Sequence, residues 1–267
     1  MKKLHTLNFL LTFFLLFSLI ACEDAFQYSP YASKVDDKNL NEKNLTNLRQ
    51  NTINTDTFSF SVIADSHYYY DNLSEVVDYI NRDTESMFTV HAGDLTESGL
   101  LWEYRNTYKI INKLHKPFFA CIGNHDYLSN GSDIFYHFFG KRNYTLNIGK
   151  NKFIFFDDVV WESINHNPDL DWLENAISTA GTDTSIFVFT HIPPWTDQLT
   201  GEKEERFRKM MTDNKVKAVI CGHLHNYEQE DHYHDGVIYI ATGSVCKEHY
   251  IVVRIKGKNF SIDPIDF

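Results

Sequence analysis

Cysteine is scarce in this chain of 267 residues and cannot build its framework. There are four cysteines, and one of them, Cys22, lies in the N-terminal leader discussed below. The other three, Cys121, Cys221 and Cys246, are an odd number, which does not make a disulfide scaffold. Cys121 and Cys221 each end an apolar run just before a polar motif, which favours buried strand residues over metal ligands. One disulfide among the three stays open if the compartment is oxidising.

An excess of positive charge is also missing. The chain has 25 Lys and Arg against 36 Asp and Glu, a formal net charge of −11. With no basic stripe, it is a poor candidate for gripping long nucleic acid through phosphates, so we expect no such partner. Small phosphate substrates are not excluded, since metal ions in a site could offset the charge locally. There is no internal repeat, and no feature predicts a protein partner.

A single apolar run near the N-terminus is short for crossing a bilayer. It extends from Leu7 to Ile20 after Lys2 and Lys3, the charged start and apolar middle of a secretory signal. It ends in Leu19-Ile20-Ala21-Cys22, which resembles a bacterial lipoprotein cleavage box and implies a lipid on Cys22. The alternative is an ordinary signal peptide with an incidental cysteine. We therefore expect a signal over residues 1–21 and an exported protein, lipid-anchored to a bacterial membrane outside the cytoplasm.

Two further regions follow the signal. Residues 22–56 contain the cysteine and a stretch rich in Asn, Asp, Lys, Ser and Thr without a sustained apolar period. This composition predicts a flexible tether. Residues 57–267 then form the predicted domain.

Apolar periodicity within the domain predicts alternating strands and helices. Strands are expected at 58–64, 87–91, 117–122, 144–148, 152–157, 185–190, 216–221, 237–241, 250–255 and 260–262, and helices at 73–82, 102–114, 133–139, 170–177 and 202–211. Such alternation indicates a largely parallel sheet. Ligands of these sheets bind beyond the carboxyl ends of the strands.

Five short segments carry side chains of the types that coordinate metals, and each comes at or near the end of an expected strand. They are Asp65-Ser66-His67, Gly93-Asp94, Gly123-Asn124-His125-Asp126, His191 and Gly222-His223-Leu224-His225. In extended chain, residues i and i+2 point the same way, so each Asp-x-His or His-x-His pair can face one metal. Hard oxygen ligands mixed with imidazoles suit two divalent or trivalent metal ions that bind phosphate and activate water.

Each segment alone is weak evidence, but their order is specific. Together they resemble the signature of the calcineurin-like metallophosphoesterase superfamily over about residues 58–241. The resemblance implies an α/β fold, a four-layer αββα sandwich of two mixed β-sheets flanked by helices. It places a dimetal site at the carboxyl edge of the strands.

The resemblance also implies a role for each motif residue. The first metal would be bound by Asp65, His67 and His225, the second by Asn124, His191 and His223, and Asp94 would bridge the two. His125 would face the substrate, where it stabilises phosphoryl oxygens or protonates the leaving oxygen. The metal ions would be Mn, Fe or Zn, and a water activated by them would attack phosphorus.

The role of Glu97 is a hypothesis that follows from what His125 requires. A histidine that acts as an acid needs a partner that holds its ring. We expect Glu97, three residues after Asp94, to hold His125. A solvated Glu97 is an equally good interpretation.

This sequence departs from the motifs of two branches of the superfamily, which narrows the range of expected substrates. Protein Ser/Thr phosphatases have Arg and Glu where this chain has Ser98 and Asp126. Purple acid phosphatases have Tyr and Gly where it has Glu97 and His67. Both branches are disfavoured.

Two aromatic side chains next to the motifs, Tyr68 and Trp195, are candidates for substrate contact, although packing on loops is the simpler interpretation of each. The sequence thus predicts an enzyme that hydrolyses phosphoester bonds, with phosphodiesters or nucleotide-like small molecules favoured as substrates. The alternatives are a phosphomonoesterase or a non-catalytic surface lipoprotein that binds metal or phosphate.

Overall fold

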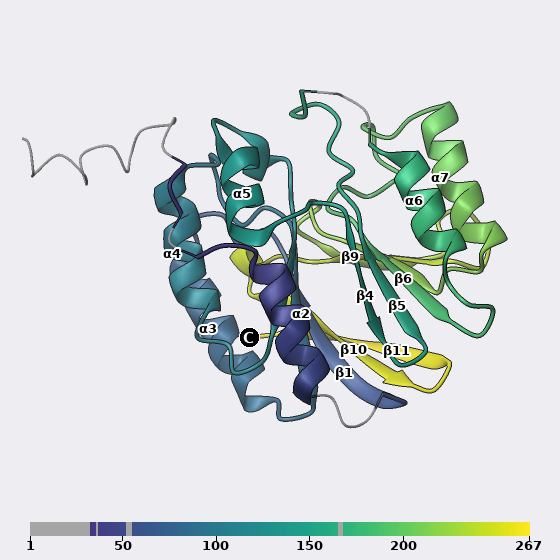
Figure 1. Ribbon diagram of the computed structural model, residues 1–267, viewed down its shortest axis with the longest axis horizontal. Helices are drawn as coiled ribbons and strands as arrows, with labels where there is room; N and C mark the ends of the chain where they lie inside the picture. The colour runs from purple at the N-terminus through teal and green to yellow at the C-terminus, as the bar shows by residue number, and fades with distance from the viewer. Residues whose placement is uncertain (1–32, 36, 52–54, 165–167) are drawn as a thin grey trace, which may run out of the picture.

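The computed structural model describes residues 33–35, 37–51, 55–164 and 168–267. The predicted signal and Cys22 lie outside these residues. Two β-sheets face each other in the middle of the molecule, and helices cover the outer face of each (Figure 1). Within the described ranges, no helix has the length and apolar character required to cross a membrane.

The first sheet is mixed. It has the strand order β11-β10-β1-β2-β3, with bounds β1 Thr57–Ile63, β2 Ser86–Ala92, β3 Phe118–Cys121, β10 His249–Lys256 and β11 Asn259–Asp266. Strands β1, β2 and β3 are parallel, whereas β10 runs antiparallel to both β1 and β11. The three parallel strands therefore end at the same edge.

The second sheet is also mixed, in the order β4-β5-β6-β7-β9-β8. Its strands are β4 Tyr144–Ile148, β5 Asn151–Phe155, β6 Ser185–Phe189, β7 Ala218–Cys221, β8 Tyr227–Glu230 and β9 Ile238–Thr242. Strands β5, β6, β7 and β9 are parallel, and antiparallel strands β4 and β8 close the two edges. The β4–β5 turn has two residues, and Gly149 provides its positive φ of 56°.

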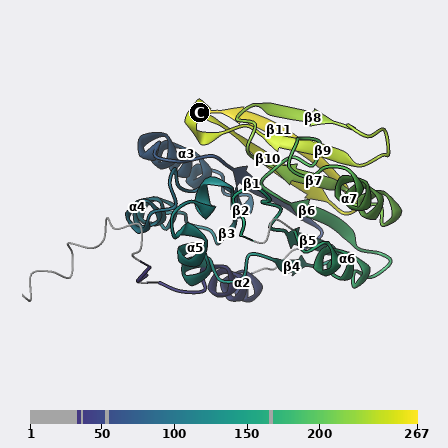
Figure 2. The same ribbon diagram turned by 90° about the horizontal axis from the view of Figure 1, so that it is seen from above.

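The helices lie on the two outer faces, as the view from above shows (Figure 2). On the side of the first sheet are α3 Tyr70–Arg82, α4 Leu101–Ile111 and α5 Gly131–Phe139, and on the side of the second are α6 Leu170–Ser178 and α7 Glu202–Asp213. Two single-turn 3₁₀ helices, η1 His125–Tyr127 and η2 Val245–Lys247, follow strands β3 and β9. The predicted four-layer αββα sandwich is confirmed.

Phenylalanine fills the layer between the two sheets. The rings of Phe60 and Phe88 stack with centroids 4.7 Å apart, and Phe153 meets Phe60 edge-on at 5.4 Å from the facing sheet. Strand β1 is buried at six of its seven positions because one face meets the second sheet and the other meets helices. This double burial explains why the strands read as continuous apolar runs.

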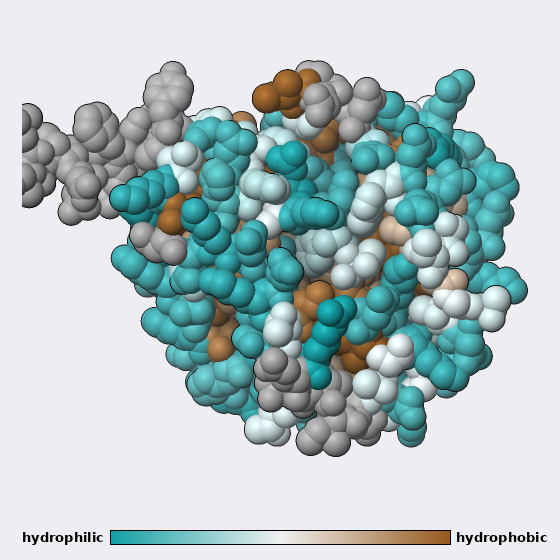
Figure 3. All heavy atoms as spheres, viewed as in Figure 1, coloured by the Kyte–Doolittle hydropathy of each residue, from teal (hydrophilic) through white to brown (hydrophobic). Residues whose placement is uncertain are grey.

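The apolar faces of the helices are buried in two outer cores. Helix α3 buries Leu73, Val76, Val77 and Ile80, the spacing of a single helical face. With the apolar side chains gathered in three cores, the face in Figure 3 is mostly hydrophilic, with small hydrophobic patches.

The tether prediction is wrong for part of its range. Residues Leu40–Asn51 form helix α2, which packs along strand β3 at the edge of the first sheet. Asn44 donates from Nδ2 to the carbonyl of Phe118 (2.8 Å), and Asn41 Oδ1 accepts the amide of Ala120 (3.1 Å). Leu48 is buried in the core between the sheets. The helix covers a strand edge that would otherwise expose unpaired backbone groups.

Candidate metal centre

All five predicted segments meet at one end of the sandwich. They follow the carboxyl ends of β1, β2 and β3 in the first sheet and of β6 and β7 in the second. Hydrogen bonds join the sheets there: His191 Nδ1 lies 2.8 Å from the carbonyl of Ala92, and both oxygens of Asp65 accept the amide of His223 at 3.0–3.1 Å. The structure thus brings together side chains as far apart in sequence as Asp65 and His225.

The backbone at these motifs is strained. Five of the seven predicted ligands have a positive φ, which non-glycine residues seldom adopt: Asp65 (54°), His67 (45°), Asp94 (55°), His223 (72°) and His225 (56°). These left-handed residues lie just beyond the strand ends, where they turn the chain sharply. Strain of this kind concentrates at functional sites.

One group of ligand atoms comes from Asp65, His67 and His225. Nε2 of His67 lies 3.3 Å from Nε2 of His225, and that nitrogen lies 3.5 Å from Oδ1 of Asp65. Two imidazole nitrogens and a carboxylate that point at one spot make a suitable donor set for a transition metal ion.

A second group contains Asp94, His191 and His223, with Asn124 between the two histidines. Oδ1 of Asn124 lies 3.2 Å from both Nε2 of His191 and Nδ1 of His223. Oδ2 of Asp94 lies 3.2 Å from Nε2 of His191 and 3.9 Å from Nε2 of His67. Asp94 therefore lies between the two groups, where the resemblance places a bridging ligand.

Three glycines make this approach possible. A Cβ on Gly93, whose φ is 96°, would lie 2.3 Å from Nδ1 of His191, and one on Gly123 would lie 2.2 Å from Oδ1 of Asp94. A Cβ on Gly222 would lie 3.0 Å from Oδ2 of Asp65. The motif glycines are thus required by the ligands' own positions.

Charge in the site is arranged around Asp94 and His191, both buried. Burial alone would raise the pKa of Asp94, but the charge and hydrogen bond of His191 outweigh it and lower that pKa. Burial likewise opposes protonation of His191, and the Asp94 carboxylate reverses this and raises the pKa of His191. A buried carboxylate that stays ionised is ready to bind a cation.

His125 lies at the exposed side of the site. Its Nδ1 lies 2.7 Å from the backbone carbonyl of Glu97, and its amide donates to Oδ1 of Asp94 at 2.9 Å. Since a carbonyl only accepts, Nδ1 carries a proton, and Nε2 can donate to a substrate oxygen when the ring is doubly protonated.

Glu97 does not hold His125 in the predicted way. Its carboxylate is 3.9 Å from Nδ1 of His125, beyond hydrogen-bond distance, and lies 3.0 Å from Nδ1 of His67 instead. The main chain of Glu97 orients His125, and the side chain faces a predicted metal ligand. Neither contact can be inferred from the spacing Asp94-x-x-Glu97 alone.

Asp126 lies outside the groups of possible ligand atoms. It is fully buried, and its oxygens accept the amides of Leu95, Thr96 and Gly123 at 3.0–3.1 Å and the Thr96 hydroxyl at 2.7 Å. It ties the loop after β2 to the loop after β3, and so fixes Asp94 relative to Asn124.

Sequence reasoning missed three further contacts with the site. Glu162 Oε1 accepts from Nδ2 of Asn124 at 3.3 Å, which orients the amide oxygen toward the histidines. Asp158 Oδ1 accepts the amides of His191 and Ile192, both at 3.2 Å. Sγ of Cys246 lies 3.6 Å from Nδ1 of His225. Glu162 and Cys246 belong to no strand-end motif, so no pattern in the sequence marks them.

The two aromatic candidates differ in exposure. Tyr68 is 52% exposed directly after His67 and stacks on Tyr69 with centroids 4.9 Å apart. Trp195 stacks on His232 at 4.0 Å and packs edge-on to Tyr239, against the core beneath α6 and α7. Packing accounts for Trp195, whereas the face of Tyr68 is open to solvent.

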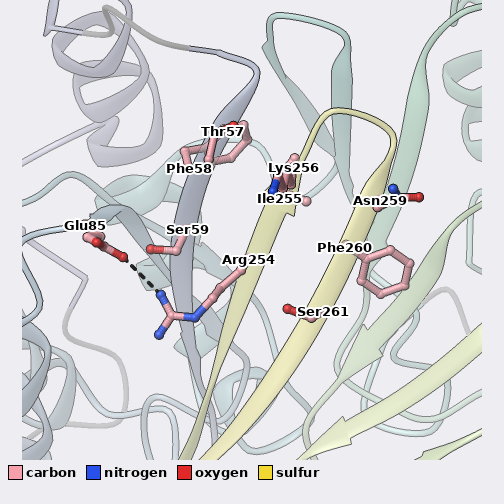
Figure 4. Close-up of a pocket in the computed structure, with 10 residues that line it drawn as sticks. All are labelled: Thr57, Phe58, Ser59, Glu85, Arg254, Ile255, Lys256, Asn259, Phe260 and Ser261. Atoms are coloured by element: carbon pink, nitrogen blue, oxygen red, sulfur yellow. Dashed lines mark hydrogen bonds and ion pairs between the residues drawn. The ribbon is translucent and has the colours of Figure 1, made fainter.

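Another cavity lies away from the metal centre. It has a volume of about 640 Å³ and lies beside the start of β1 and the β10–β11 turn, the opposite end from the predicted ligands (Figure 4). Its one arginine, Arg254, is committed to ion pairs with Glu85 (3.3 Å) and Asp263 (2.7 Å). None of the groups of metal-binding side chains found among the described residues includes a residue of this cavity.

Comparison with known proteins agrees with this geometry. A curated relative, 3′,5′-cyclic adenosine monophosphate phosphodiesterase CpdA from Vibrio vulnificus (strain CMCP6), is 24% identical over 194 residues, 69% of each chain. A dimetal phosphatase from Danio rerio superposes with a TM-score of 0.64 at 14% identity, over 78% of this chain and 96% of that one. A purple acid phosphatase from yellow lupin (Lupinus luteus) seeds gives 0.62 at 10% identity, over 80% and 52%.

The matching family model is that of calcineurin-like phosphoesterases, and it covers residues 58–227. This is more than half of the chain and includes all five strand-end segments. The family is dimetal-dependent, and the donor atoms gathered here fit two metal ions. The chain therefore belongs to the calcineurin-like phosphoesterase family and is a hydrolase acting on phosphoester bonds.

Proposed function

We propose that this protein is a phosphodiesterase of nucleotide-like small molecules. The observation that carries the proposal is the position of His125, at the open side of two ligand groups and fixed by the Glu97 carbonyl at 2.7 Å. An alkoxide leaving from a diester needs a proton, and an imidazolium held through Nδ1–H can donate the proton on its Nε2. The likeness to a curated cyclic nucleotide phosphodiesterase supports the same class of substrate.

The predicted ligands would hold the metal ions in two sets. Asp65, His67 and His225 form one, Asn124, His191 and His223 form the other, and Asp94 reaches both. When bound, such ions supply a nucleophilic water near neutral pH and neutralise charge on the phosphoryl oxygens. The chain itself orients the reacting groups: Glu162 fixes the amide of Asn124, and the main chain of Glu97 fixes His125.

Hydrolysis of two model esters tests the proposal. Protein stripped of metal and refilled with Mn, Fe or Zn would be assayed on bis-p-nitrophenyl phosphate and on p-nitrophenyl phosphate. We expect metal-dependent turnover with the diester preferred, and a loss of at least about 100-fold in Asp94→Asn, because the variant removes a charge that faces both ligand groups.

Asp266→Asn, which changes an exposed aspartate on β11, is the matched control and should keep full turnover. A preference for p-nitrophenyl phosphate would instead establish a monoesterase. Folded, metal-loaded protein without activity on either ester would contradict the proposal.

We also propose that the protein is exported and held at a bacterial membrane by a lipid on Cys22. The support is the charged and apolar leader that ends at this cysteine. Detergent phase partitioning of the full chain should place wild type in the detergent phase and Cys22→Ser in the aqueous phase. Equal partitioning of the two would contradict the anchor.

A further inference from the structure

A second cavity lies beside the metal centre. Its volume is about 430 Å³, within the range of roughly 300–1,000 Å³ that is typical of small-molecule sites. It opens between the end of α5 with the following segment and the loop after β5. The residues that matter here are Tyr127, Tyr136, Lys141, Arg142, Asp157 and Ser163.

Two segments, η1 and the loop between β5 and α6, supply neighbouring residues to the metal centre and to this cavity. In η1, His125 lies in the metal centre and Tyr127 lines the cavity. After β5, Asp158 accepts the amide of His191 while Asp157 lines the cavity. Further along the same loop, Glu162 contacts Asn124 while Ser163 lines the cavity. The two sites therefore share their walls and lie side by side.

Three polar side chains that line the cavity bind one another. Asp157 accepts the Tyr127 hydroxyl and pairs with Nε of Arg142 at 3.2 Å. The Arg142 guanidinium also lies over the Tyr127 ring, 5.5 Å from its centroid. These three side chains hold one another, so they form a rigid wall and have little capacity left for a ligand.

Two other lining residues, Tyr136 and Lys141, are free to bind. Tyr136 is 54% exposed, with its ring open to solvent. Lys141 is exposed and forms no ion pair with any side chain in the described part of the chain. An aromatic face next to an uncommitted cation suits a planar ring that carries carbonyl oxygens, since the ring can stack and the oxygens can accept from the ammonium group.

We propose that this cavity binds the nucleoside part of a nucleotide diester whose phosphorus lies at the metal centre, an assignment that rests on the phosphodiesterase function proposed above. The base stacks on Tyr136, and a carbonyl oxygen of the base accepts from Lys141. The shared walls set the distance between base and phosphorus. Binding energy from the base then positions the phosphoryl group for attack.

Two esters with the same leaving group test this subsite. Thymidine 5′-(p-nitrophenyl phosphate) and methyl p-nitrophenyl phosphate both release p-nitrophenol, but only the first carries a base. In Tyr136→Ala and in Lys141→Met, we expect KM for the thymidine ester to rise about tenfold while kcat/KM for the methyl ester stays within twofold of wild type. Lys109→Met, an exposed lysine on α4, is the control and should change neither.

Equal effects of Tyr136→Ala and Lys141→Met on both esters, or no effect on either, would overturn the subsite. Equilibrium dialysis of thymidine 5′-monophosphate against the Mn-loaded protein separates this result from failure of the proposed function. If wild type hydrolyses neither ester yet binds the nucleotide more tightly than both variants, the subsite stands and the phosphodiesterase proposal falls. If both variants bind it as tightly as wild type, the subsite is wrong.

Discussion

At the scale of single residues, the geometry of the site depends on glycine as much as on the ligands. We predict that Gly93→Ala abolishes turnover, because its Cβ would lie 2.3 Å from His191 Nδ1 in addition to the strain at a φ of 96°. Gly236→Ala is the matched control, with a φ of 82° and no atom within 4 Å of its Cβ.

The control should lose about 1–2 kcal/mol of stability from strain alone and keep its turnover. Steady-state assays and urea denaturation of both variants measure the two effects. Equal losses of turnover in Gly93→Ala and Gly236→Ala would show that backbone strain, and not the contact with His191, decides the phenotype.

A second residue-scale prediction concerns Asp158 and pH. Burial raises the pKa of this carboxyl to about 7, although the charge of His191 and two amide donors act in the opposite direction. The folded value exceeds the usual one for an unfolded chain, so between about pH 4 and 7 the folded protein binds more protons. This carboxyl therefore costs increasing stability as pH rises through that window.

In Asp158→Asn, the side-chain oxygen can still accept from both amides, but the side chain cannot ionise. Its stability relative to wild type, in metal-free protein, should increase from about pH 4 to pH 7 and then level off, with a difference of up to about 4 kcal/mol. Urea denaturation at several pH values measures it. A difference that does not change with pH would mean that Asp158 is ionised throughout.

At the scale of elements, the sequence predicted most strands and helices but not helix α2. The domain strands are long apolar runs that end in motifs, and this pattern is strong. Residues Leu40–Asn51 are polar overall, with a helical face too short to detect, and their stability comes from β3 instead. Asn41 and Asn44 bond to backbone groups of a strand about 75 positions away, which no local pattern reveals.

We therefore predict that α2 belongs to the folded domain. Leu48→Ala should destabilise the protein by about 2–4 kcal/mol, since Leu48 is 3% exposed in the core between the sheets. Thr46→Ala, on the exposed side of the same helix, should change stability by less than about 0.5 kcal/mol. Thermal denaturation compares them. Equal and small effects of the two substitutions would mean that Leu40–Asn51 belongs to the tether and not to the folded domain.

The same contrast holds for the site. The meeting of the seven predicted ligands and His125 at one end of the sheets could be predicted from the sequence, because the motif residues follow strands and parallel strands end together. Glu162 and Cys246 were not, because their loops follow no pattern and only the tertiary fold brings them to Asn124 and His225. The carboxylate of Glu97 was assigned to His125 because sequence distance does not give side chain direction.

At the scale of the whole molecule, each group of predicted ligands combines side chains from both sheets. Asp65 and His67 follow β1 of the first sheet, while His223 and His225 follow β7 of the second. A metal ion held by Asp65, His67 and His225 would thus join the sheets. We predict that removing the metals lowers the thermal midpoint of unfolding, because an ion that binds only the folded state stabilises it by mass action. Calorimetry before and after chelation measures it, and an unchanged midpoint would contradict a cross-sheet site.

The most direct test of the central claim is a titration of metal-free protein with Mn²⁺ in which bound metal and turnover of bis-p-nitrophenyl phosphate are measured on the same samples. The two ligand groups share Asp94, so we predict that two ions bind per chain and that turnover appears only as the second one binds. Full turnover with a single bound ion, or binding of two ions without any turnover, would contradict a reaction that requires both.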